Sequence, residues 1–169
     1  MNRALLSSRN LEWCTPKDFF DELNTEFHFT LDAAATKDNA LCANYYTQEM
    51  DGLTLPWNPK TGAVFCNPPY GREVGKWVKK AYEEAKIRCI TIVMLLPART
   101  DTSYFHEYIY GFAEVRFLRG RLKFTDGAGN AYWPAPFPSM VVIYNYNPSK
   151  SMANFGRCFT QGLAEGLKC

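Results

Sequence analysis

The sequence predicts an α/β domain, a sheet with helices on both faces. Short apolar runs alternate along the chain with segments of helical periodicity, which is the pattern of strands followed by helices. The run at 89–96 is continuously apolar and stops at Pro97, as is typical of a central parallel strand. We expect a compact single domain over residues 1–169, with a core at about 12–146 and a C-terminal tail at 147–169.

The expected helices show capping residues or apolar side chains at helical spacing. Thr15 and Pro16 are typical of a helix N-cap and first position, with Asp18 in the first turn. Residues 74–86 place their apolar side chains along one helical face, and residues 103–110 form the next expected helix.

The expected strands are short apolar segments between turn residues. They are residues 27–32, 63–66, 89–96, 114–118, 121–124 and 140–146. Ligands of open α/β sheets bind beyond the carboxyl ends of the strands. Because Asp32, Asn67 and Pro97 all fall at such ends, we expect one crevice to collect them.

The most informative segment is the loop after the strand at 63–66, which reads Asn67-Pro68-Pro69-Tyr70. The prolines lack an N–H and stiffen the residues before them. The loop therefore offers two fixed acceptors, the Asn67 side-chain oxygen and the Pro68 carbonyl, beside an aromatic ring. A planar amino group on a ring needs those features, although a proline-rich loop after a buried strand also accounts for the pattern.

Two acids and a small-residue turn are candidates for holding a cofactor. Asp32 ends an early strand, where an acid commonly binds a ribose or an ammonium group, but it also suits a helix N-cap. Ala33 begins an Ala-Ala-Ala turn that allows close approach without the freedom of glycine at positive φ. Asp51 suits either contact with an adenine amino group or an ordinary Asp-Gly turn.

The strongest basic cluster lies at residues 116–124. Arg119, Arg121 and Lys123 suit phosphate contacts, and Phe124 suits stacking on a base. A charged strand edge explains the same residues without nucleic acid. The loop at 126–138, with its Asn and aromatic residues, is the candidate for base recognition.

The composition restricts the class of protein. The net charge is only +2, so any nucleic-acid site must be a local patch. The 6 cysteines form no CxxC pair and no cluster with histidine, so the sequence gives no support for a metal site. We find no signal peptide and no apolar run of the roughly 20 residues that a membrane span needs. These features predict a cytoplasmic protein with reduced thiols, and the family resemblance described next implies a bacterial or phage-encoded one.

The linked motifs resemble a known family. Asn67-Pro68-Pro69-Tyr70 is similar to the signature of S-adenosylmethionine-dependent amino-methyltransferases. The wider set resembles the phage-type DNA N6-adenine methyltransferases over roughly residues 12–146. It comprises Trp13, Thr15, Pro16, Leu31 to Ala35, Asn44 to Tyr46, Asp51, Trp57, Trp77, Leu96 to Thr102 and Gly120 to Phe124. The Ala-rich turn departs from the Gly-rich turn usual in methyltransferases.

The resemblance implies a Rossmann-like methyltransferase fold, S-adenosylmethionine as cofactor, and adenine N6 in double-stranded DNA as the methyl acceptor. By this resemblance, the catalytic loop holds the target amino group through Asn67 and Pro68, and Tyr70 stacks on the flipped base. The implied sites are catalytic for Asn67, Pro68, Pro69 and Tyr70, cofactor-binding for Trp13, Thr15, Pro16, Asp32, Ala33 and Asp51, and substrate-binding for Arg119, Arg121, Lys123 and Phe124. Trp13 suits the core equally well.

Two other functions fit the residues. An RNA or protein-glutamine amino-methyltransferase would use the same acceptor loop, because that loop suits any planar NH2 group. A nucleic-acid-binding protein that kept the fold and lost methyl transfer would explain the missing Gly-rich turn. The basic cluster favours a nucleic-acid substrate, and failure to bind the cofactor would favour the binding protein.

Overall fold

The computed structural model describes residues 13–126 and 134–145. One sheet carries the strands β1 (Phe29–Asp32), β2 (Asn44–Tyr45), β3 (Ala63–Cys66), β4 (Thr91–Pro97), β5 (Glu114–Phe117) and β6 (Ser139–Asn145). The spatial order is β2-β1-β3-β4-β6-β5. Strands β2, β1, β3 and β4 are parallel, while β6 runs antiparallel to both β4 and β5. The sheet is therefore mixed, with its parallel part at the β2 end.

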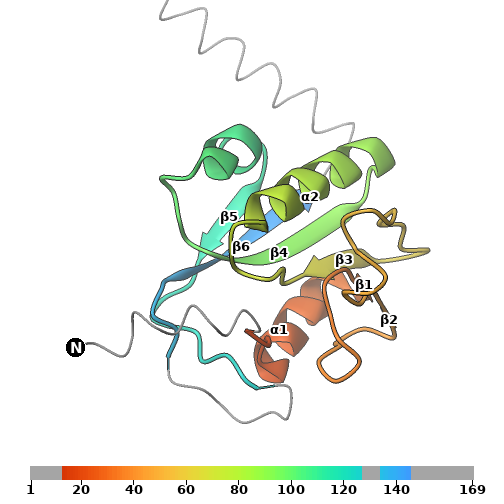
Figure 1. Ribbon diagram of the computed structural model, residues 1–169, viewed down its shortest axis with the longest axis horizontal. Helices are drawn as coiled ribbons and strands as arrows, with labels where there is room; N and C mark the ends of the chain where they lie inside the picture. The colour runs from red at the N-terminus through yellow and green to blue at the C-terminus, as the bar shows by residue number, and fades with distance from the viewer. Residues whose placement is uncertain (1–12, 127–133, 146–169) are drawn as a thin grey trace, which may run out of the picture.

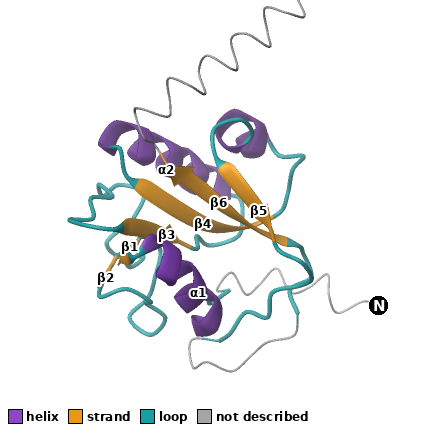
Figure 2. Cartoon of the chain, turned by 180° about the vertical axis from the view of Figure 1, so that it is seen from behind, coloured by secondary structure: helices purple, strands orange, loops and turns teal. Residues whose placement is uncertain are grey.

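Helices lie on both faces of this sheet (Figures 1 and 2), which confirms the α/β class. Helix α1 (Lys17–Phe27) covers one face, and α2 (Val74–Arg88) covers the other with the short π-helix η2 (Phe105–Ile109). Alternate side chains of β3, β4 and β6 enter two separate cores. On β4, for example, Ile92, Met94 and Leu96 face α2, whereas Val93 and Leu95 lie in the α1 core.

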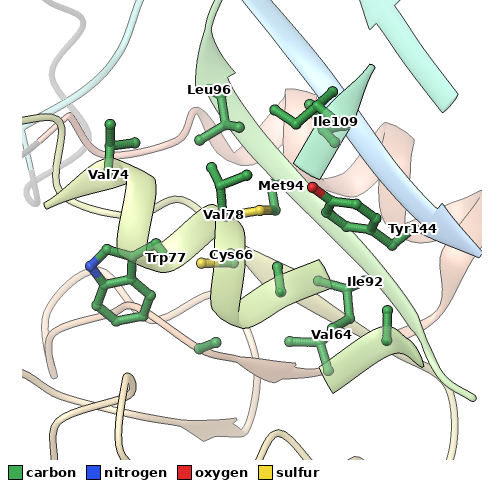
Figure 3. Packing of buried hydrophobic residues seen from close by; sticks show 14 of the residues in the cluster. Val64, Cys66, Val74, Trp77, Val78, Ile92, Met94, Leu96, Ile109 and Tyr144 are labelled. Carbon is green, nitrogen blue, oxygen red and sulfur yellow. The ribbon is translucent and has the colours of Figure 1, made fainter. Parts of the chain in front are cut away.

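The core beneath α2 contains tightly packed aliphatic, sulfur and aromatic side chains (Figure 3). Val78 is fully buried against residues of β3 and β4, including Cys66 and Met94. Each buried aliphatic side chain contributes roughly 1.5–3 kcal/mol relative to an exposed one. This core holds the amino end of α2, and with it the loop after β3, against the carboxyl ends of the parallel strands.

Two strands begin later than the sequence predicts because the preceding helices run further. Helix α1 continues to Phe27 and ends where His28 adopts a left-handed backbone, with φ of 54°, so β1 begins at Phe29. Helix α2 likewise continues to Arg88 before Cys89, with φ of 55°, and β4 begins at Thr91. Apolar composition does not separate the last helical turn from the strand.

Two further predictions were wrong. Residues 121–124 form no strand, because they pair with no strand among residues 13–126 and 134–145. Within these ranges, the Leu122 carbonyl accepts a hydrogen bond from the Ala135 N–H. Thr15 does not cap α1: Pro16 occupies the N-cap position, and the cap makes no side-chain hydrogen bond. The hydroxyl of Thr15 has a different partner, described below.

Candidate functional site

A cavity of about 320 Å³ lies at the carboxyl ends of β1 and β3. The crevice expected at the strand ends therefore exists and collects Asp32 and Asn67. Pro97 does not line it, because Pro97 is buried and pairs with Ser139 of β6. The lining residues are Trp13, Cys14, Thr15, Asp32, Ala34, Ala35, Thr36, Asn39, Leu41, Tyr46, Thr47, Gln48, Asp51, Gly52, Phe65, Asn67, Pro68, Pro69 and Trp77.

Asn67 follows the last residue of β3, and its side-chain amide is held at one end. The Nδ2 group donates to the backbone carbonyl of Trp13 and, at 3.0 Å, to Oγ1 of Thr15. The Oδ1 atom is buried and has no hydrogen-bond partner among the described residues. An acceptor removed from water without a partner costs about 1–3 kcal/mol. Asn67, a residue of the cavity wall, therefore carries a buried acceptor without a partner, which a bound donor that reaches it would satisfy.

The rest of the Asn-Pro-Pro-Tyr loop divides between the cavity and the core. Pro68 and Pro69 line the cavity, whereas Tyr70 does not. The Tyr70 hydroxyl donates to the Leu95 carbonyl at 3.1 Å, and its ring packs edge-on against Phe124 and Phe137. Burial raises the pKa of Tyr70 well above its usual range. Tyr70 is therefore mostly buried in the α1 core, and its stacking on a base stays a prediction.

Asp32 is a buried carboxylate in the cavity wall. Its oxygens accept the backbone N–H groups of Leu41 at 3.3 Å and Ala34 at 3.4 Å. Burial raises its pKa to about 6, although these two N–H groups act in the opposite direction. The alternative of a helix N-cap does not apply, because no helix follows β1 before β2. Asp32 therefore holds the turn that follows it while lying beside the cavity.

The Ala-Ala-Ala turn contributes different residues from the one predicted. Ala33 is fully buried, donates its N–H to Phe65 at 2.9 Å, and does not line the cavity. Its predicted cofactor contact does not fit this position, because the alternation of strand β1 continues through it and directs it into the α2 core. Ala34 and Ala35, the next two residues, line the cavity instead.

The Asp-Gly turn expected at Asp51 is confirmed, whereas its contact with an adenine amino group stays a prediction. Its carboxylate accepts the Leu53 N–H at 3.1 Å and its backbone has φ of 54°, which is Asp-Gly turn geometry. It is also exposed and lines the cavity. The next position, 52, requires glycine because its backbone lies close to Ala33: an added Cβ would lie 2.4 Å from the Ala33 carbonyl oxygen.

The segment before α1 also contributes residues to the cavity wall. Trp13 and Thr15 line the cavity, and Pro16 does not. Trp13 also packs edge-on against Phe124 and Phe137, with 5.4 Å between ring centroids in each pair. Both alternatives for Trp13, core packing and cavity lining, thus describe the same side chain.

The basic cluster is only partly available for binding. Arg119, Arg121 and Lys123 are exposed. Arg116 is instead tied to Glu26 of α1, through two hydrogen bonds of 2.6 and 2.7 Å, and to Glu114. Phe124 is fully buried, so the predicted stacking on a base does not fit its place in the core. The candidate recognition residues Asn130, Tyr132 and Trp133 lie outside the described residues.

Comparison with known proteins identifies the family of this chain. The model of the DNA N-6-adenine-methyltransferase (Dam) family matches residues 3–157, which is most of the chain. The chain belongs to this family. The family resemblance predicted from the linked motifs is therefore confirmed.

Two relatives of this Dam-family chain are phage proteins, each described as a DNA N-6-adenine-methyltransferase. The protein of Escherichia phage T1 is 36% identical over 121 residues, which cover 71% of this chain and 49% of the phage protein. The protein of Haemophilus phage HP1 is 27% identical over 136 residues, covering 78% of this chain and 77% of the phage protein. The chain thus spans about half the length of the first relative and most of the second.

Sequence reasoning missed several cavity residues of this Dam-family chain. Thr36 and Asn39 bond reciprocally: the Thr36 N–H donates to Asn39 Oδ1 at 2.6 Å, and the Asn39 N–H donates to Thr36 Oγ1 at 3.3 Å. The Thr-x-x-Asn spacing carries this signal, as in a capping box. The sequence assigns Trp77 only to the apolar face of its helix, yet this side chain also lines the cavity.

The described residues of the Dam-family chain give two further results. They contain no group of three or more His, Cys, Asp and Glu side chains arranged to hold a metal ion. Within the same ranges, every helix is too short or too polar to span a membrane.

Proposed function

We propose that this chain is a DNA adenine methyltransferase that transfers a methyl group from S-adenosylmethionine to N6 of an adenine flipped out of double-stranded DNA. The proposal includes a Rossmann-like methyltransferase architecture for the mixed sheet. Family membership and the names of the phage relatives support the reaction. The observation that carries it for this chain is that Asn67 lines the cavity and its buried Oδ1 has no hydrogen-bond partner among the described residues.

The chemistry of the acceptor explains why Asn67 suits this role. The exocyclic amine of adenine is a poor nucleophile, because its lone pair is delocalised into the ring. Oδ1 of Asn67 and the Pro68 carbonyl would each accept one of its two hydrogens. These bonds favour a more pyramidal nitrogen and hold it in one orientation. Positioning of this kind is a large catalytic resource.

The cavity also has hydrogen-bond acceptors that suit the cofactor. S-adenosylmethionine supplies an activated methyl group on a sulfonium and carries an ammonium group and ribose hydroxyls. Asp32 is a buried acceptor for such groups, and Asp51 offers a second carboxylate from the opposite loop. Ala34 and Ala35 leave room for close approach, so alanine replaces the usual glycines without closing the cavity. The residues present fit this cofactor.

Access to the DNA substrate follows from the location of the site. A methyl donor cannot reach N6 inside a stacked duplex, so the base must be flipped at a cost of a few kcal/mol. Arg119, Arg121 and Lys123 are exposed on the segment that leads to Thr125, and Thr125 bonds to Cys14 beside the cavity. We propose that these cations hold the phosphates around the flipped nucleotide.

The test is incubation of the purified chain with tritiated S-adenosylmethionine and, in parallel, unmethylated duplex DNA, RNA and a glutamine peptide. We expect label in N6-methyl-deoxyadenosine after digestion and chromatography of the DNA. Label only in RNA or only in the peptide would mean that the substrate is RNA or protein and not DNA. Absence of label together with absence of cofactor binding by calorimetry would refute the enzyme and favour a binding protein.

A further inference from the structure

We infer that Thr15 is a positioning residue for Asn67: with the Trp13 carbonyl, its hydroxyl fixes the side-chain amide so that Oδ1 remains the free acceptor. This inference rests on the proposed function, because it assigns Thr15 to the target-amine site. The local sequence pattern around Thr15 indicates only helix capping, and the family resemblance implies only cofactor binding.

The Asn67 amide has both of its donors occupied. A primary amide has two N–H donors on its nitrogen and lone pairs only on its oxygen. The acceptors for the two Nδ2 donors are the Trp13 carbonyl oxygen and Oγ1 of Thr15. The opposite atom, Oδ1, has no partner among the described residues. All the binding capacity left on this side chain is therefore acceptor capacity.

The same two contacts set the direction of the amide. A carbonyl oxygen only accepts, so the Trp13 carbonyl excludes the flipped amide, which would place Oδ1 against another oxygen. Thr15 then supplies the second point that prevents rotation about the Cβ–Cγ bond. One contact selects the orientation, and the second holds the plane.

The segment that provides these acceptors is itself held in place. The Thr125 N–H and hydroxyl both donate to the Cys14 carbonyl, at 2.9 and 3.3 Å. The Trp13 ring packs edge-on against Phe124 and Phe137, and such pairs contribute about 0.5–1.5 kcal/mol beyond burial. Thr15 itself is buried. The two acceptors therefore have fixed positions relative to the Asn67 amide.

The functional consequence is that the Asn67 acceptor is oriented before the substrate arrives. Without the clamp formed by Trp13 and Thr15, the amide must be ordered when the base binds, and misplacement of a reacting group by about 1 Å costs up to roughly 100-fold in rate. Thr15 does not touch the reacting atoms; it acts through Asn67.

The test compares three full-length variants. Thr15→Val keeps the side-chain shape and removes the acceptor, and Thr15→Ser restores the hydroxyl. Thr25→Val is the matched control, since Thr25 is an exposed threonine of α1 whose hydroxyl donates only to the Asp21 carbonyl. For each, we would measure the single-turnover methylation rate at saturating cofactor, the cofactor dissociation constant, and hydrogen exchange of the Asn67 side-chain NH2 by nitrogen-15 NMR.

For Thr15→Val we expect a rate about 10- to 100-fold lower, an unchanged cofactor dissociation constant, and faster exchange of the Asn67 NH2 protons. Thr15→Ser and Thr25→Val should behave as the wild type. A wild-type rate for Thr15→Val would overturn the inference. Equal loss of rate and cofactor affinity in Thr15→Val would also overturn it, because Thr15 would then be a cofactor contact.

The NMR measurement separates this inference from the proposed function. If the wild type methylates no adenine, the proposed function fails, but slow exchange of the Asn67 NH2 that depends on the Thr15 hydroxyl would still establish the clamp. If methylation occurs and exchange is the same in all variants, only the clamp fails.

Discussion

The backbone N–H of Leu41 donates to the Asp32 carboxylate at 3.3 Å, which joins the residue that ends β1 to a loop nine positions further along the chain. The bond holds a carboxylate that is only 3% exposed. Burial still dominates, and the pKa of Asp32 is raised to about 6. The side chain proposed to bind the cofactor is therefore also one whose ionisation destabilises the folded chain.

The first prediction concerns stability and pH. Because the folded-state pKa of Asp32 is above its ordinary value of 3.8, the folded chain retains this proton more strongly than the unfolded chain. Its contribution to stability is full below about pH 4 and is lost as pH rises through about 6. The loss amounts to at most about 3 kcal/mol. Denaturant titrations at several pH values would measure the free energy of unfolding of the wild type and of Asp32→Asn. We expect this free energy to fall between about pH 4 and 6 by this contribution in the wild type and not in Asp32→Asn.

The raised pKa of Asp32 also predicts how cofactor binding depends on pH. If the ionised carboxylate holds the cofactor, the dissociation constant should rise by up to about tenfold for each pH unit below 6. Calorimetry between pH 5 and 8 checks this, and Asp32→Asn should bind weakly at every pH. If the wild type binds S-adenosylmethionine equally well at pH 5 and at pH 7, the Asp32 carboxylate does not bind the cofactor.

Two glycine variants test how closely the backbone of Gly52 approaches the Ala33 carbonyl beside the cavity. A Cβ at Gly52 would lie 2.4 Å from the Ala33 carbonyl and 3.0 Å from Trp77, so Gly52→Ala should destabilise by about 1–3 kcal/mol. In α2, a Cβ at Gly75 meets Tyr104 at an ordinary 3.6 Å. Gly75→Ala should therefore stabilise by up to about 1 kcal/mol. Thermal unfolding measures both, and a neutral Gly52→Ala would contradict the packing described.

A fourth prediction concerns the exposed cations. Replacing Arg119, Arg121 and Lys123 by alanine should weaken binding to any duplex sequence. The slope of log K against log salt should become shallower by about 0.9 for each phosphate that the variant no longer neutralises. Lys79→Ala is the matched control, since Lys79 lies on α2 and pairs with Glu83 at 3.8 Å. Filter binding or anisotropy across a salt series would measure the slopes. An unchanged slope in the triple variant would place the DNA elsewhere.

The sequence predicted the parts of the site that depend on local pattern. Asn67 could be located because an apolar run ends there in two prolines, and Asp32 because it ends another such run. The role of Thr15 could not, because its partner lies 52 residues away and its capping signal is a local one. The burial of Phe124 could not be predicted for a related reason: a basic neighbourhood indicates exposure, whereas tertiary packing buries the ring against Tyr70.

The alanine turn shows a further limit of pattern reasoning. The sequence identifies the turn after Asp32 but places the cofactor contact at Ala33, which continues the alternation of β1 into the core. The residues on either side of it, Asp32 and Ala34, line the cavity. Strand boundaries decide which face a residue takes, and a shift of one position reverses that face.

The most direct test of the central claim is the single-turnover methylation rate of Asn67→Ala on duplex DNA, measured beside its affinity for S-adenosylmethionine. If Oδ1 of Asn67 holds the target amine, methyl transfer should be abolished while cofactor affinity stays close to that of the wild type. A near-normal rate in Asn67→Ala would contradict the role proposed for this residue.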